Sequence, residues 1–267
     1  MKLLKYFLIL IFTLDLTYAQ KISYEERKNW EIFYKEKNIH GCFLLYDLNA
    51  DKYMVYNRAR IDSEFIPAST FKIFNSLAAL ESGAVRDENE IIKWDGVHRD
   101  IESWNGDHNM RTAFRNSVVW FYQELARRIG YELMQKYVNL AGYGNKNIDG
   151  GIDLFWLQGD LRITPVQQID FLVRLEKDSL PFSKRTMDIV KDIMIIEQNE
   201  NYILRAKTGW GARFEKEVGW FVGYIEINKQ EKNLYFFVNN IDINEVKDTE
   251  GRYSITNEIL KELKIIE

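Results

Sequence analysis

The 267-residue chain contains one cysteine, three prolines and three histidines. With Cys42 alone, it has no internal disulfide and no zinc or iron–sulfur site built on several cysteines. The histidines lack the i, i+4 spacing of a helical metal pair, and no H-E-x-x-H sequence occurs, so we expect no metal. Basic charge is not in excess, because the formal net charge is −4. This balance argues against a nucleic-acid partner bound through a basic face.

Long apolar runs are also missing, since no segment after the N-terminus reaches the ~18 apolar residues of a membrane-spanning helix. Residues 1–19 resemble a secretory signal, with Lys2 and Lys5, an apolar stretch over 6–14 and a small-residue cleavage site that ends at Ala19. An uncleaved anchor is the alternative, but the stretch is too short to cross ~30 Å of hydrocarbon. We expect cleavage after Ala19 and a secreted, periplasmic protein without stable membrane insertion.

Apolar residues make up 46% of the chain and aromatic residues 14%, which is enough to bury a core and excludes a disordered chain. Helical periodicity is expected over residues 23–38, 67–83, 110–129, 131–141, 164–175 and 249–266. Strand-like patterns cover residues 41–48, 52–57, 204–208, 217–227 and 233–240. Thr164, followed by Pro165 and by Gln167, predicts a capped helix start.

Strands at both ends with helices between them predict an α+β fold. We expect one antiparallel sheet, flanked by N- and C-terminal helices, that carries a mostly helical inserted lobe. Residues 20–62 and 180–267 would form the sheet lobe, and residues 63–179 the helical lobe. The cleft between two lobes is the default place for a site.

Four short motifs follow one another along the chain: Ser69-Thr70-Phe71-Lys72, Ser117-Val118-Val119, Tyr143-Gly144-Asn145 and Lys207-Thr208-Gly209. The first carries no weight alone, since ~0.8 matches are expected by chance in this composition. All four together have a chance expectation of ~0.002 before their order is counted. In the first motif a hydroxyl and an amine share one helix face, so the amine can reach the hydroxyl oxygen. That pairing suits nucleophilic catalysis.

On these motifs the chain resembles the penicillin-recognising serine enzymes, and specifically the class D β-lactamases (oxacillinases). In that family the motifs read S-x-x-K, S-x-V, Y-G-N and K-T-G. The segment with Phe155-Trp156-Leu157, Gly159 and Leu161-Arg162-Ile163 is similar to the family's tryptophan segment, and Arg252 precedes Ile255-Thr256 near the end. The resemblance covers essentially the whole mature chain. It implies a β-lactamase/transpeptidase-like fold and hydrolysis of penicillin-type antibiotics, which confers resistance.

The resemblance implies a serine acyl-enzyme formed by Ser69. An ordinary lysine with a pKa of ~10.4 cannot take the serine proton at neutral pH, but burial would lower the pKa of Lys72. The resemblance further implies that Lys72 takes up carbon dioxide, supplied as such or as bicarbonate, and becomes an N6-carboxylysine that acts as general base. The Trp156 indole N–H is expected to donate to this carbamate. Ser117 would relay a proton to the lactam nitrogen.

Lys207 completes the expected catalytic set, because its charge favours an anionic substrate. Thr208 and Arg252 are expected to hold the carboxylate next to the lactam ring, which a guanidinium fits bidentately. The backbone N–H groups of Ser69 and Trp210 would bind the oxyanion of the tetrahedral intermediate, the first of them with the help of a helix N-terminus.

The remaining candidates surround this set. Gly209 is expected to let substrate lie close against its strand, since it has no side chain. Val119, Tyr143 and Asn145 are expected to contact substrate, although the Tyr-Gly-Asn motif could instead shape a turn beside the cleft. Trp104 lines the cleft mouth or packs in the core.

Two other functions fit a similar site. A β-lactam sensor domain retains the acyl group, and a penicillin-binding transpeptidase or carboxypeptidase acts on cell-wall peptides. The tryptophan segment and the Y-G-N form favour class D. We therefore expect a small-molecule β-lactam partner, a monomer or homodimer, and no cofactor beyond carbon dioxide.

Overall fold

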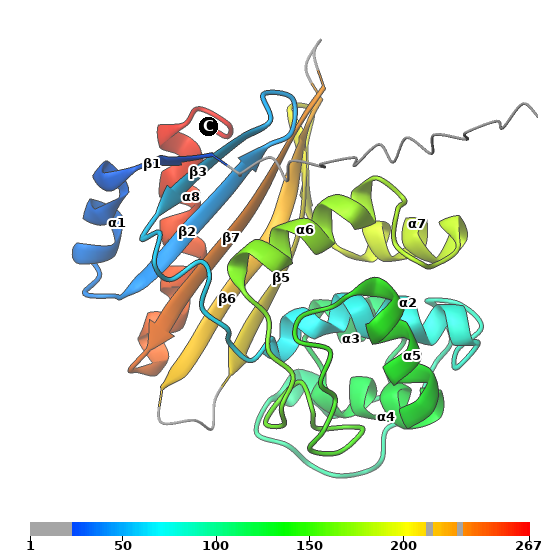
Figure 1. Ribbon diagram of the computed structural model, residues 1–267. Helices are drawn as coiled ribbons and strands as arrows, with labels where there is room; N and C mark the ends of the chain where they lie inside the picture. The colour runs from blue at the N-terminus through cyan, green and yellow to red at the C-terminus, as the bar shows by residue number, and fades with distance from the viewer. Residues whose placement is uncertain (1–22, 212–215, 229–231) are drawn as a thin grey trace, which may run out of the picture.

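The computed structural model describes residues 23–211, 216–228 and 232–267. Within them a seven-stranded sheet runs in the order β1-β3-β2-β7-β6-β5-β4, with helices on both faces (Figure 1). The strands are β1 (Tyr24–Glu26), β2 (Gly41–Asp47), β3 (Lys52–Tyr56), β4 (Ile195–Gln198), β5 (Tyr202–Gly211), β6 (Glu217–Ile227) and β7 (Asn233–Ile243). The α-helices are α1 (Glu31–Lys35), α2 (Lys72–Ser82), α3 (Met110–Arg115), α4 (Val119–Ile129), α5 (Tyr131–Ala141), α6 (Pro165–Glu176), α7 (Lys184–Ile193) and α8 (Gly251–Glu262).

The sheet separates two apolar clusters. Strands β6 and β7 lie in its middle and are buried on both faces, which explains their nearly continuous apolar sequences. On one face Phe43, Phe237 and Ile255 belong to the cluster beneath α1 and α8. On the other face Val222 and Val238 belong to the larger cluster that extends into the helical lobe. The chain thus forms a helical layer, the sheet and a larger helical lobe (Figure 1).

Helix α2 is the centre of the helical lobe. It contacts α4, α5 and α7, and every residue from Lys72 to Leu80 is buried. Gly83 ends it with a left-handed φ of 75°, the usual conformation for a glycine after a helix. Helix α6 lies on β7, β6 and β2, and it begins with the expected capping box between Thr164 and Gln167.

The prediction of one sheet built from both ends of the chain is confirmed, with two differences. The short strand β1 was not expected, and it pairs with β3 in parallel, so the sheet is mixed rather than wholly antiparallel. Residues 23–38 do not form one helix, because Tyr24–Glu26 is that strand and only Glu31–Lys35 is α-helical. Tyr24 of β1 lies opposite Tyr53 of β3, with ring centroids 5.5 Å apart. This contact between strands outweighs the helical spacing of the apolar residues in this segment.

Two elements, α7 and β4, had no counterpart among the expected ones. Helix α7 packs against α2, α3 and α6, and β4 pairs with β5 at the sheet edge. The lobe boundaries at residues 63 and 180 stay a prediction.

The expected signal segment over residues 1–19 lies outside the described residues. In the described part of the chain, no helix has the length and apolar character needed to cross a membrane.

Candidate active site

Ser69 and Lys72 meet where a short 3₁₀ helix (Ala68–Phe71) passes into α2. Lys72 is the first residue of α2, so the two side chains are one turn apart, and Lys72 Nζ is hydrogen bonded to Ser69 Oγ at 2.7 Å. The backbone N–H of Ala68 donates to the Trp156 carbonyl at 3.0 Å, which joins this turn to the tryptophan segment. The predicted pairing of hydroxyl and amine is thus present.

The Lys72 amine lies in a low-dielectric environment. The residue is 0% exposed and forms no ion pair with any described residue. Burial, helped by the positive charge of Lys207, lowers the pKa of Lys72 well below its ordinary value. Nζ also lies 5.4 Å from the centre of the Tyr122 ring. A neutral amine can accept a proton, so Lys72 meets the main requirement for a base next to Ser69.

Trp156 is buried and leaves one polar atom unsatisfied. Its ring stacks on Phe71, the residue before Lys72, with centroids 5.3 Å apart. The indole Nε1 is buried without a hydrogen-bond partner. An unpaired buried N–H costs about 1–3 kcal/mol, and this one is a donor available to an acceptor beside the Ser69–Lys72 turn. The Trp156 N–H, which is expected to donate to a carbamate, therefore has no competing acceptor among the described residues.

Ser117 lies in a turn that breaks the expected helix over residues 110–129. Helix α3 ends at Arg115 and α4 begins at Val119, and between them Ser117 has a φ of 55°. A serine in the left-handed region is strained, so neighbouring contacts must hold it. The turn lies between α3, whose Phe114 contacts Lys207, and α4, whose Tyr122 contacts Lys72. Ser117 therefore lies between the helices that meet the two lysines, with the half-buried Val119 opening α4.

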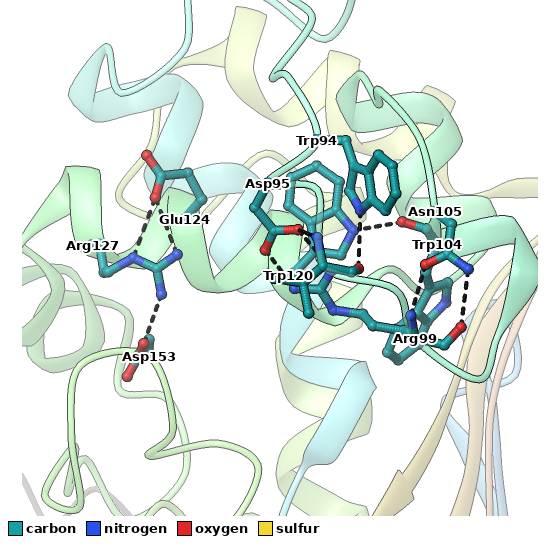
Figure 2. A network of polar contacts seen from close by, with 10 residues as sticks. Trp94, Asp95, Arg99, Trp104, Asn105, Trp120, Glu124, Arg127 and Asp153 are labelled. Atoms are coloured by element: carbon teal, nitrogen blue, oxygen red, sulfur yellow. Dashed lines mark hydrogen bonds and ion pairs between the residues drawn. The ribbon is translucent and has the colours of Figure 1, made fainter.

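Two indole N–H groups link the loop that carries Trp104 to this turn and to α4, and Figure 2 shows the Trp104 and Trp120 side chains. Trp104 Nε1 donates to the carbonyl of Asn116 at 3.0 Å, and Trp120 Nε1 donates to the carbonyl of Trp104 at 2.8 Å. In the same view Arg127 joins Glu124 of α4 to Asp153, just before the tryptophan segment. The sequence left the role of Trp104 open, and the structure shows that it binds the backbone beside Ser117.

Strand β5 brings Lys207 to the site. Lys207 is 5% exposed, and burial, with a smaller contribution from the charge of Arg252, lowers its pKa to about 7. Its Nζ lies 5.4 Å from the Phe114 ring centre and 3.5 Å from Thr208 Oγ1. Strand β4 pairs with β5 only as far as Arg205, so the β5 edge beyond that residue has no strand partner among the described residues. Such an edge is open to a ligand.

Gly209 has a structural reason to be glycine. An added Cβ would lie 3.1 Å from the Pro67 carbonyl oxygen and 3.1 Å from Thr70 Cγ2. The missing side chain thus lets β5 approach the turn that carries Ser69, a packing role that the sequence reasoning did not foresee.

Arg252 reaches β5 from α8. Its Nη1 donates to the Gly209 carbonyl at 3.0 Å and its Nε to the Thr249 carbonyl at 2.6 Å. Partial burial lowers its pKa. The guanidinium is therefore fixed beside the strand that bears Thr208, where a carboxylate was expected. Trp210, 39% exposed, follows on the same strand, and its Nε1 donates to Glu217 at 2.7 Å.

The structure gives Tyr143 and Asn145 structural contacts, and their contact with substrate stays a prediction. Tyr143 is 1% exposed and packs against Phe71, Phe74 and Phe171 in the core. Asn145 Nδ2 donates to the Asp160 carbonyl, and its Oδ1 accepts from the Arg162 N–H. These bonds connect the motif to the tryptophan segment, which agrees with the alternative that the motif shapes a turn.

Gly144 shows why the motif is needed. Its φ is 54°, and an added Cβ would lie 2.1 Å from the Arg162 carbonyl oxygen. Only glycine permits this approach, so the Tyr-Gly-Asn motif braces the segment that carries Trp156.

Two polar residues near the site were not found from the sequence. Ser76 Oγ donates to the Lys72 carbonyl at 2.8 Å and is 2.9 Å from Tyr122 OH. Gln168 Nε2 donates to Thr70 Oγ1 at 2.8 Å, which joins α6 to the Ser69 turn. Ser76, four residues after Lys72, could have been found from helix spacing, whereas the Gln168 contact joins distant segments.

Comparisons with known proteins agree with this site. The family model described as the penicillin binding protein transpeptidase domain matches residues 25–264. Beta-lactamase OXA-48 of Klebsiella pneumoniae is 44% identical over 244 residues, 91% of each chain. Probable beta-lactamase YbxI of Bacillus subtilis (strain 168) is 46% identical over 230 residues, 86% of this chain and 83% of the relative.

Solved structures give the same result. The class D β-lactamase YbXI from Nostoc superposes with a TM-score of 0.87 at 50% identity, over 90% of this chain and 100% of that one. FUS-1 (OXA-85), from Fusobacterium nucleatum subsp. polymorphum, gives a TM-score of 0.87 at 39% identity, over 91% and 100% of the two chains. The resemblance inferred from the motifs is confirmed, and the chain belongs to the class D serine β-lactamases.

Proposed function

We propose that the protein hydrolyses the β-lactam ring of penicillin-type antibiotics through an acyl-enzyme on Ser69, with a base at Lys72. The observation that carries this proposal is the 2.7 Å contact between Ser69 Oγ and the buried Lys72 amine. Hydrolysis of the drug outside the cytoplasm would protect the cell that exports the enzyme, so the function is antibiotic resistance.

In the first step Ser69 Oγ bonds to the lactam carbonyl carbon, and the base at Lys72 takes the hydroxyl proton. The lactam C–N bond then breaks, and the ring nitrogen receives a proton through Ser117. In the second step a water oxygen bonds to the acyl carbon and gives its proton to the same base. Ser69 leaves with a proton, so the sum is one lactam and one water converted to one ring-opened acid.

Binding groups on β5 and α8 support this reaction. Lys207 and Thr208 of β5, together with Arg252, which binds the Gly209 carbonyl of the same strand, would hold the carboxylate of the substrate. The backbone N–H groups of Ser69 and Trp210 would stabilise the oxyanion.

We also propose that Lys72 is carboxylated in the active enzyme. Carbon dioxide adds to the neutral amine with loss of one proton, and the resulting carbamate supplies an anionic oxygen that accepts protons. The unpaired buried Nε1 of Trp156 fits such a group, because it is a donor without an acceptor beside the Ser69–Lys72 turn.

The carbamate is tested by ¹³C NMR of the protein in ¹³C-bicarbonate. We expect one carbamate resonance that is absent in Lys72→Ala and weakened in Trp156→Phe, which keeps the stacking on Phe71 but has no N–H. Activity should fall when carbon dioxide is removed and return with bicarbonate. Full activity after carbon dioxide removal, with no resonance at saturating bicarbonate, would contradict carboxylation.

We propose that residues 1–19 are a signal peptide, which makes the mature protein an exported, periplasmic or secreted enzyme. The positive start, the short apolar stretch and the small-residue end of this segment support the proposal. The intact mass of the protein recovered from the periplasm or the medium should match a chain that begins at Gln20. A mass that includes residues 1–19 would contradict cleavage.

A further inference from the structure

A groove of about 290 Å³ crosses the open edge of the sheet beside the active site. Helix α3 contributes one face, since positions 111, 114 and 115 are neighbours on a helix. The end of α7, the start of β4, strands β5 and β6 and the first turn of α8 contribute the rest. The residues that matter here are Arg111, Phe114, Arg115, Ile196, Phe221 and Tyr253.

The groove is continuous with the substrate site, because Lys207 and Thr208 line it. On β5, Ala206 belongs to the cluster beneath α8, and Thr208 lies on the same face by the period of a strand. Lys207 lies on the opposite face, over Phe114. The groove thus passes around the strand edge, and a ligand that binds Thr208 lies at its mouth.

The charges of the groove favour an anion at its rim. Arg111 is neutralised, since it bonds to Asp192 at 2.7 Å and to Glu88 at 3.0 Å. Arg115 is exposed and forms no ion pair within the described part of the chain. Arg115 therefore has its charge available to a ligand.

The groove also offers apolar surface. Phe114 and Phe221 line it, although each is only 2% exposed, and Phe221 packs on Tyr253 with ring centres 4.8 Å apart. Ile196, at 52%, and Tyr253, at 37%, are among the exposed large apolar residues. Exposed apolar side chains that gather at the end of a substrate site indicate a binding surface.

We propose that this groove is a second substrate subsite, which takes a flat apolar substituent ending in an anionic group. The substituent is carried on the ring atom next to the carboxylate-bearing carbon, as at position 3 of a cephalosporin. With the ring carboxylate on Thr208, this substituent enters the groove over Ile196 and Tyr253, and its anion meets Arg115. The inference rests on the proposed function and extends it to a substrate class.

The test uses three cephalosporins with the same 7-acylamino group. Position 3 carries a methyl group in the first, a phenylthiomethyl group in the second and a 4-carboxyphenylthiomethyl group in the third. We expect the full-length mature enzyme to show the highest kcat/KM for the third compound. Arg115→Gln should lower kcat/KM about threefold for that compound alone, the size of an exposed ion pair.

A second variant separates apolar contact from charge. Ile196→Ser should lower kcat/KM about fivefold for both aryl compounds and leave the methyl compound unchanged, because it removes apolar surface from the groove. The control is Arg58→Gln, a half-buried arginine paired with Asp62 beyond β3 at the far side of the sheet, which should change none of the three.

The outcomes separate the two proposals. Equal kcat/KM for the three compounds, or an equal loss for all three in Arg115→Gln, would overturn the proposal that the groove is a substrate subsite. Neither result would contradict lactam hydrolysis. If the enzyme hydrolyses a penicillin but none of the three cephalosporins, the groove proposal fails and the proposed function stands. If it hydrolyses no penicillin either, the proposed function itself fails.

Discussion

Two lysines, Lys72 and Lys207, are buried in one site without an ion-pair partner among the described residues. Each loses hydration, and the charge of Lys207 disfavours the charged form of Lys72 further. Their roles differ, because Lys72 must be neutral to accept a proton, whereas Lys207 must be charged to attract an anion. The pKa of Lys207, about 7, leaves it charged in part of the free enzyme at neutral pH.

This difference predicts the pH dependence of kcat/KM, which reports ionisations of the free enzyme. As pH rises through the pKa of Lys207, about 7 beside the uncharged Lys72 amine and higher beside a Lys72 carbamate, Lys207 loses its proton, so kcat/KM for an anionic penicillin should fall. The measurement is kcat/KM from pH 5.5 to 9 for the wild type and for Lys207→Gln. The variant should be slower and lack this fall. A wild-type profile that is flat from pH 6 to 9 would contradict this assignment.

At the residue scale, the sequence predicted the Ser69–Lys72 pair correctly, since a spacing of three places both groups on one helix face. It did not predict that Trp156 Nε1 lacks a partner, because that depends on every neighbour in the folded core. The burial of Tyr143 was missed for the same reason, since its neighbours Phe74 and Phe171 come from two helices.

Among the elements, the α3–α4 turn is the feature that sequence periodicity missed. The apolar spacing continues through residues 110–129, and no glycine or proline marks a break. At the break Ser117 is left-handed, the Trp104 indole binds the Asn116 carbonyl beside it, and the Trp120 indole binds the carbonyl of Trp104. Strand patterns at 217–227 and 233–240 predicted β6 and most of β7, because buried strands have clear apolar runs.

Trp104→Phe tests the role of the turn. Phenylalanine keeps the ring but cannot donate to the Asn116 carbonyl, so Ser117 loses a support of its strained backbone. We expect kcat/KM to fall on the order of tenfold, with little change in the melting temperature. The matched control is Trp94→Phe, in the same loop, whose Nε1 donates to the Val97 carbonyl (Figure 2). Equal losses of kcat/KM in the two variants would show that the loop acts as a whole. That result would contradict a specific role of Trp104 in positioning Ser117.

For the whole molecule, the two buried lysines set how stability depends on pH. Both have a folded-state pKa below the unfolded value near 10.4, so between pH 7 and 9 the unfolded chain binds protons that the folded protein does not. The free energy of unfolding therefore rises with pH in this window, by up to ~1.4 kcal/mol per pH unit for each such lysine. The site thus makes the fold more stable at alkaline pH.

Urea unfolding at pH 6.5 to 9, in buffers free of carbon dioxide, checks this expectation. The free energy of unfolding of the wild type should rise with pH, and Lys72→Met should be more stable at pH 7 with a smaller slope. Lys35→Met, at an exposed position of α1, is the control and should keep the wild-type slope. Stability that falls from pH 7 to 9 would be inconsistent with two buried neutral lysines.

The architecture was largely predictable, because strand patterns at both chain ends require one sheet assembled from the termini. The parallel β1 and the edge strand β4 were not, since three or four residues carry too little pattern. The open β5 edge, where the substrate site and the groove meet, follows from where β4 stops, and only the folded structure gives that point.

The central claim is turnover through an acyl group on Ser69, and time-resolved mass spectrometry tests it most directly. The mature protein is mixed with excess penicillin and sampled from seconds to an hour. We expect a transient adduct of one penicillin on Ser69, absent in Ser69→Ala, and complete conversion of the drug to its ring-opened acid. A stoichiometric adduct that persists without bulk hydrolysis would contradict turnover and favour a sensor or a penicillin-binding peptidase. If neither an adduct nor conversion of the drug is seen, the assignment of Ser69 as the nucleophile is refuted.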